Sequence, residues 1–147
     1  MKYTIERINE FNYPFFDDML FWRETGKERY HTDNPTPSQV INELANPNLY
    51  VYAAAIDNRF VGWISLVYIP KISRWKKGHI YVDEIWVAPE YRRQGIAKSL
   101  MQKADELRTQ LSATGIRLYV NIQNPDAKKL YEKCGFKEDG QALFMEK

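Results

Sequence analysis

The segment that most suggests chemistry is a run of basic and small residues leading into a predicted helix. In chain order it consists of Arg92, Arg93, Gln94, Gly95, Ile96, Ala97 and Lys98. A glycine at a helix start permits close approach to the backbone, and the N–H groups of the first turn have no partner within the helix. With the helix dipole and the added positive charge, these groups predict a phosphate or pyrophosphate site. The alternative is an ordinary basic turn, since the run is neither a Walker loop nor a dinucleotide fingerprint.

The strand predicted before this run contains a change of phase. Apolar residues stand at even positions before Asp83 and Glu84 and at odd positions after them. The even pair is Ile80 and Val82, and the odd pair is Ile85 and Val87. A β-bulge shifts the phase by one residue and removes ladder partners locally, so we predict a bulge at Asp83-Glu84 with free backbone groups beyond it. Alternatively, Tyr81 and Trp86 make both faces apolar and no bulge exists.

Two further polar residues stand near the C-terminal end of the chain. Asn124 precedes Pro125, where its side-chain oxygen is expected to cap a helix. Tyr131 lies on the apolar face of that helix, and a buried tyrosine hydroxyl needs a partner even when the ring is only part of the core. Cys134 is expected to be structural, because a catalytic thiol needs a nearby base and neither His31 nor His79 is obviously placed to be one.

Hydrophobic periodicity predicts the elements that position these residues. Strands are predicted at residues 3–8, 49–56, 60–69, 79–87 and 116–122, with a turn at 57–59 and a terminal hairpin over 136–145. Helices are predicted at residues 11–22 and 95–111, from a Thr36 cap to before Pro47, and from Asn124 to Gly135. Polar connectors are expected at 23–34 and, with a basic character, at 71–78. We therefore predict one α+β domain, residues 1–147, built on a mixed sheet.

Composition narrows the class of protein. The 147 residues suit one domain, and the single cysteine excludes an intramolecular disulfide and a multi-cysteine metal site. The formal charge is only +2, which argues against a nucleic-acid-binding module. No apolar run approaches the ~20 residues of a membrane-spanning helix, so we expect a cytoplasmic protein without a membrane partner.

Taken together, three motifs in this order resemble the GCN5-related N-acetyltransferase (GNAT) superfamily. The first is the run from Asp83 to Ala97, whose Arg92-Arg93-Gln94-Gly95-Ile96-Ala97 fits the family's acetyl-CoA signature at every defined position. The others are Asn124-Pro125-Asp126-Ala127 and Tyr131-Glu132-Lys133-Cys134-Gly135-Phe136. The resemblance implies a three-layer α/β/α fold, with a mostly antiparallel, twisted sheet flanked by helices.

The resemblance also implies where acetyl-CoA binds, as a co-substrate and without a metal. The pyrophosphate would rest on the signature loop at residues 92–98, and pantetheine would pair like an extra strand with Ile85, Trp86 and Val87. Asn124 would contact the cofactor arm. Tyr131 would lie near the thioester sulfur and protonate the departing thiolate.

The general base is less specified, because bases differ across the family. Attack on a thioester needs a free amine, so a carboxylate or a water relay must take a proton. Acids at the Asp83-Glu84 pair serve this role in relatives such as polyamine acetyltransferases; we prefer Asp83, which shares parity with Tyr81, and keep Glu84 second. The alternative is two strand carboxylates paired with Arg or Lys. The N–H groups of Ile85 and Val87 are expected to polarise the carbonyl.

We therefore predict an N-acetyltransferase that moves an acetyl group from acetyl-CoA to a primary amine by direct attack in a ternary complex. The acceptor side, residues 11–44, is aromatic and carries Asp17, Asp18 and Glu24, which suits a small amine such as a polyamine or an aminoglycoside. The alternatives are a non-catalytic acyl-CoA sensor and a peptide or protein amine acetyltransferase. Because the family often forms dimers, a homodimer is also expected.

Overall fold

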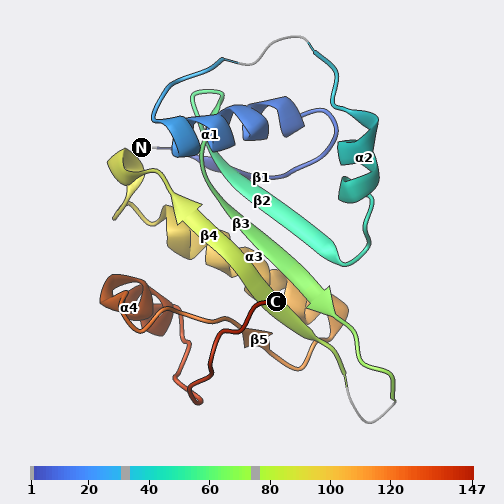
Figure 1. Cartoon of the computed structure of the whole chain (residues 1–147), viewed down its shortest axis with the longest axis vertical. Helices are drawn as coiled ribbons and strands as arrows, with labels where there is room; N and C mark the ends of the chain where they lie inside the picture. The colour runs from blue at the N-terminus through green and yellow to red at the C-terminus, as the bar shows by residue number, and fades with distance from the viewer. Residues whose placement is uncertain (1, 31–33, 74–76) are drawn as a thin grey trace.

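The computed structural model describes residues 2–30, 34–73 and 77–147, and it has a five-stranded sheet in the order β1-β2-β3-β4-β5 (Figure 1). The strands are β1 Thr4–Arg7, β2 Leu49–Ile56, β3 Arg59–Ile69, β4 His79–Val87 and β5 Ile116–Arg117. The helices are α1 Tyr13–Thr25, α2 Ser38–Leu44, α3 Ile96–Leu111 and α4 Pro125–Lys133, and a 3-10 turn spans Pro89–Tyr91. Strands β1 to β4 are antiparallel neighbours and β5 is parallel to β4, which confirms a mixed, mostly antiparallel sheet.

Helices cover both faces of the sheet (Figure 1). On one face α3 packs on the sheet, because its predicted apolar stripe, including Ile96, Leu100 and Leu107, is buried. On the other face α1 packs through Phe16 against the buried Trp63 of β3. Together these two packings confirm the α/β/α layers.

Three local expectations are wrong. Thr36 does not cap α2: its hydroxyl donates to the carbonyl oxygen of Glu10, and α2 begins after Pro37 without a side-chain cap. The strand expected at 116–122 is reduced to Ile116–Arg117. The tail does not form a hairpin, since residues 134–147 contain no strand. The large apolar side chains of residues 143–145 remain exposed, so the end of the tail gains little burial to offset the entropy of ordering its backbone.

None of the helices in the described ranges is long and apolar enough to cross a membrane.

Candidate functional site

The bulge predicted in β4 is present. Ser65 of β3 pairs with Glu84 and the next residue, Leu66, pairs with Val82, so Asp83 has no Cα partner on β3. One extra residue therefore stands on β4, and it explains why the apolar phase changes there. The prediction of a bulge is confirmed.

Beyond the bulge, β4 has an open edge on the β5 side. Within the described residues, β5 pairs with β4 only at Ile80 and Tyr81. The N–H of Ala88 donates to the carbonyl oxygen of Val61 on the β3 side. Because successive residues of a strand direct their N–H groups to opposite sides, those of Ile85 and Val87 point to the open edge. This edge, from Ile85 to Val87, is called the β4 edge below.

The signature loop leaves backbone N–H groups available at the start of α3. Arg93 and Gly95 have left-handed φ values of 61° and 87°, and no described side chain caps the helix. The helical hydrogen bonds begin with the N–H of Ser99, which donates to the carbonyl oxygen of Gly95. The N–H groups of residues 96–98 therefore precede the first helical bond and point out of the helix start. This is the geometry of an anion site.

Two side chains, those of Arg92 and Tyr3, hold this loop in place through hydrogen bonds. The Nε of Arg92 donates to the carbonyl oxygen of Val87 at 2.8 Å, which ties the loop to the end of the β4 edge. The hydroxyl of Tyr3, on the segment before β1, donates to the carbonyl oxygen of Gly95 at 3.2 Å and lies 2.7 Å from the Oγ of Ser99. The contribution of Tyr3 was missed from the sequence, because the two ends of the contact are about ninety residues apart.

Asn124 and Tyr131 are positioned by α4. The Asn124 side chain accepts a hydrogen bond from the N–H of Ala127, as its capping position predicts. The half-buried Tyr131 ring packs edge-on against Phe136, with 6.2 Å between ring centroids. Burial, and to a lesser extent the Cys134 thiol, raises the pKa of the Tyr131 hydroxyl. In the described part of the chain no residue hydrogen-bonds to this hydroxyl, so it is protonated at neutral pH and available to a ligand.

Cys134 does not have the environment of a nucleophile. Its pKa is raised, chiefly by burial, and the lowering effect of Lys98 on α3 is the smaller one. A raised pKa disfavours the thiolate, which is the reactive form. His79 is buried and neutral, since burial lowers its pKa, and it stands at the far end of β4. His31 lies outside the described residues.

Asp83 and Glu84 are both exposed. Glu84 is in phase with Trp86, whose side chain packs among the α1-side residues. Asp83 is near enough to Tyr81 for its charge to raise the pKa of that phenol. A bulge lets two consecutive side chains share one face, so both carboxylates face the α1 side of the sheet.

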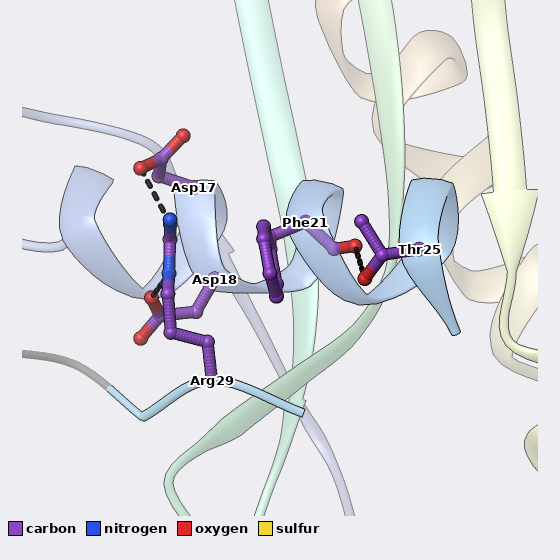
Figure 2. A network of polar contacts seen from close by, with 5 residues as sticks. All are labelled: Asp17, Asp18, Phe21, Thr25 and Arg29. Atoms are coloured by element: carbon purple, nitrogen blue, oxygen red, sulfur yellow. Dashed lines mark hydrogen bonds and ion pairs between the residues drawn. The ribbon is translucent and has the colours of Figure 1, made fainter. Parts of the chain in front are cut away.

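The acceptor side differs from expectation in its charge. Figure 2 shows Arg29 reaching back to α1, where its Nη2 lies 2.6 Å from the Oδ2 of Asp17 and its Nε lies 2.8 Å from the Oδ1 of Asp18. Two of the three acids predicted to attract an amine are therefore paired. Phe21 lies beneath the Arg29 guanidinium, at 4.7 Å to the ring centroid, and the carbonyl oxygen of Phe21 accepts a hydrogen bond from Thr25.

A cavity of about 370 Å³ lies beside this ion pair, between α1 and residues 34–37. Its lining includes Tyr13, Asp17 and Asp18, and none of the residues predicted to bind the cofactor. It is therefore separate from the β4 edge and the signature loop. Arg74 and Lys76, two of the basic residues in the connector predicted at 71–78, lie outside the described residues.

Comparison with known proteins identifies the family. A family model described as "Acetyltransferase (GNAT) family" matches residues 10–136. The chain is also 31% identical over 126 residues to the spermidine N(1)-acetyltransferase of Vibrio cholerae serotype O1, covering 85% of this chain and 69% of that protein. The chain belongs to the GNAT acetyltransferase family. It is thus an acetyl-CoA-dependent N-acetyltransferase.

Other proteins similar to this acetyltransferase agree in family or fold. It is 36% identical over 69 residues to the thialysine N-epsilon-acetyltransferase of Bos taurus, covering 47% of this chain and 41% of that protein. An aminoglycoside acetyltransferase from an uncultured soil metagenomic sample has a TM-score of 0.80 at 19% identity, covering 99% of this chain and 95% of that one. An aminoglycoside N-acetyltransferase in complex with CoA has a TM-score of 0.78 at 17% identity, with coverages of 99% and 95%. The two structures support the fold.

The residues of this acetyltransferase suit coenzyme A on chemical grounds. The uncapped start of α3 offers N–H donors to a diphosphate, and the β4 edge offers alternating donors and acceptors to the amides of a pantetheine arm. The described residues contain no group of three or more His, Cys, Asp or Glu side chains placed to hold a metal ion.

Proposed function

We propose that this acetyltransferase acetylates a primary amine of a small molecule by direct attack within a ternary complex. The observation that carries the proposal is the continuity between the β4 edge and the uncapped start of α3, which the bond from Arg92 to Val87 fastens together. One extended ligand can contact both. The printed names of the relatives, which specify spermidine and aminoglycosides, support an acceptor of this size.

In this proposal the backbone supplies most of the donor site. The N–H groups of residues 93–98 bind the diphosphate, with Arg93 and Lys98 adding positive charge, and the β4 edge binds the pantetheine amides. Bound acetyl-CoA supplies a thioester carbonyl that an amine can attack. The N–H groups of Ile85 or Val87 stabilise the negative charge that develops on that carbonyl oxygen. Asn124 contacts the cofactor arm while its oxygen caps α4.

Proton transfers complete the reaction. A lysine-like amine has a pKa of about 10.4 and is mostly protonated at neutral pH. We propose that Asp83, or Glu84 in second place, accepts its proton directly or through water, since both face the α1 side without a described ion-pair partner. The amine nitrogen then bonds to the acetyl carbon and releases its second proton to water. The carbon–sulfur bond breaks, and Tyr131 gives its proton to the departing sulfur. Solvent reprotonates Tyr131, and the products are the acetylated amine and CoA.

A homodimer is also part of the proposal. The tail carries three consecutive large apolar residues, Leu143, Phe144 and Met145, each more than 80% exposed. A contiguous apolar surface of this kind is typical of an association site.

The test is an acceptor screen on the wild type and Tyr131→Phe, read by mass spectrometry for the gain of one acetyl group. We expect the wild type to acetylate at least one small amine and Tyr131→Phe to lower kcat by about 10²- to 10⁴-fold, the range for a lost general acid. Because the pKa of the Tyr131 hydroxyl is raised, this hydroxyl keeps its proton well above neutral pH. We therefore expect the wild-type kcat not to decline as the pH rises to about 10.

Two results would contradict this proposal. If the wild type binds acetyl-CoA and acetylates no amine, the chain is a sensor instead. If Tyr131→Phe retains the wild-type kcat, the leaving thiolate is protonated by another group.

A further inference from the structure

The guanidinium of Arg23 lies over a pair of tryptophan rings. It lies in the last turn of α1, and its guanidinium carbon is 5.0 Å from the ring centroid of Trp63 and 5.9 Å from that of Trp86. The two rings are 5.3 Å apart, and Trp22 meets Trp86 edge-on at 6.1 Å. Stacking on indole faces limits the motion of a guanidinium without using its N–H donors.

Unlike Arg29 and Arg59, which also stack on rings of the α1 side, Arg23 has no acid partner in the described part of the chain. Arg29 stacks on Phe21 and is paired with Asp17 and Asp18. Arg59 stacks on Trp22 at 3.7 Å and is paired with Glu28 at 2.9 Å. Among the described residues no carboxylate lies within ion-pair distance of Arg23, which is exposed. The N–H donors of the Arg23 guanidinium are therefore restricted in orientation and have no acid partner among the described residues.

Arg23 lies close to the part of β4 where the proposed reaction takes place. Trp86 stands on the β4 edge between Ile85 and Val87, and its ring lies on the α1 side, the face that Glu84 shares. Residues two apart on a strand are separated by roughly 7 Å, so the tryptophan pair that carries Arg23 is next to Glu84, the second of the two proposed bases. In Figure 1 the C-terminal end of α1 accordingly lies beside the end of β4.

We infer that Arg23 binds a carboxylate of the acceptor, and that the acceptor is an amine that also carries a carboxylate, as amino acids do. This inference rests on the proposed function and specifies its acceptor. A guanidinium can donate two parallel hydrogen bonds to one carboxylate. Because stacking already restricts the Arg23 guanidinium, little conformational entropy is lost when these two bonds form. The pairing of Arg29 with Asp17 and Asp18 offsets one of their two negative charges, so an anionic group on the acceptor meets less repulsion on this face than two unpaired acids would cause.

The experiment compares amines that differ only by the carboxylate. The pairs are lysine and cadaverine, ornithine and putrescine, and phenylalanine and phenethylamine, each assayed with acetyl-CoA for kcat/KM. We expect the wild type to prefer the carboxylate-bearing member of at least one pair. Arg23→Met should lower kcat/KM for the carboxylate-bearing amine by about 10- to 100-fold, which is the loss expected for charge-assisted hydrogen bonds. The same substitution should lower kcat/KM far less for the amine without the carboxylate.

Two further variants separate recognition from structure. Arg59→Met removes a stacked arginine that already has an acid partner, so it should leave the ratio within each pair unchanged. Arg23→Lys keeps the charge without the planar fork, so it should restore part of the preference. Thermal unfolding of each variant checks that it is folded, and the ratio within a pair does not depend on the fraction folded.

The outcomes distinguish this inference from the proposed function. If the wild type acetylates amines but prefers the members without a carboxylate, or if Arg23→Met lowers both members of a pair equally, the inference is overturned and the proposed function stands. If the wild type acetylates no amine of the panel or of the wider screen, the proposed function fails and the inference falls with it.

Discussion

At the scale of single residues, Gly95 is the position where a side chain would most directly affect the donor site. Its φ of 87° costs an L-residue about 1–2 kcal/mol, and relieving that strain would turn the neighbouring N–H groups. We expect Gly95→Ala to weaken CoA binding by about tenfold, measured by calorimetry. Gly115→Ala is the matched control, because an added Cβ there meets no atom within 4 Å and its φ is ordinary. Equal affinity in both variants would show that the loop conformation is unimportant.

The carboxylate pair illustrates how far residue types predict a role. Two adjacent acids on a regular strand would face opposite sides, and only a bulge can place both on the acceptor side. The bulge places Asp83 outside the β3 register and leaves Glu84 paired with Ser65, so both face α1. The residue types alone were enough to predict a carboxylate base at this position. Which of the two acids acts as the base stays a proposal.

At the scale of elements, the segment before β1 supports the start of α3 through Tyr3. Its hydroxyl contacts the carbonyl oxygen of Gly95 and the Oγ of Ser99. We expect Tyr3→Phe to lower the free energy of unfolding by about 1 kcal/mol and to weaken CoA binding several-fold, measured by denaturant unfolding and calorimetry. Tyr52→Phe on β2 is the control, since no described residue hydrogen-bonds to its hydroxyl. A stability loss without any change in CoA affinity would mean that Tyr3 does not position the loop.

Several elements were predictable because their signals are local. The apolar stripe of α3, the β-branched and aromatic composition of β2 and β3 and the cap of α4 each depend on residues a few positions apart. Thr36 was predicted incorrectly because its hydroxyl found an acceptor in Glu10, which is distant in sequence. The tail was predicted incorrectly because a strand needs a neighbour, and Ile116–Arg117 provides almost none.

At the scale of the whole molecule, the exposed tail determines the expected assembly. We expect light scattering at micromolar concentration to give about twice the 17.4 kDa of one chain, and Phe144→Ser to shift the mass toward that of one chain. Phe11→Ser, which also removes an exposed phenylalanine, is the control and should leave the mass unchanged. A wild type that remains monomeric at every concentration would contradict the proposed homodimer.

The sequence by itself determined the family, the mixed sheet, the bulge in β4 and the helix start at Gly95, because each is encoded by neighbouring residues whose spacing sets the backbone. Only the tertiary structure decided which charges remain available. Arg29 pairs with two acids of α1, and Arg23 stacks on tryptophans from β3 and β4 without an acid partner in the described chain. The Arg29 pairs form when the segment after α1 folds back along the helix, and the stacking of Arg23 forms only when packing brings α1 onto the sheet.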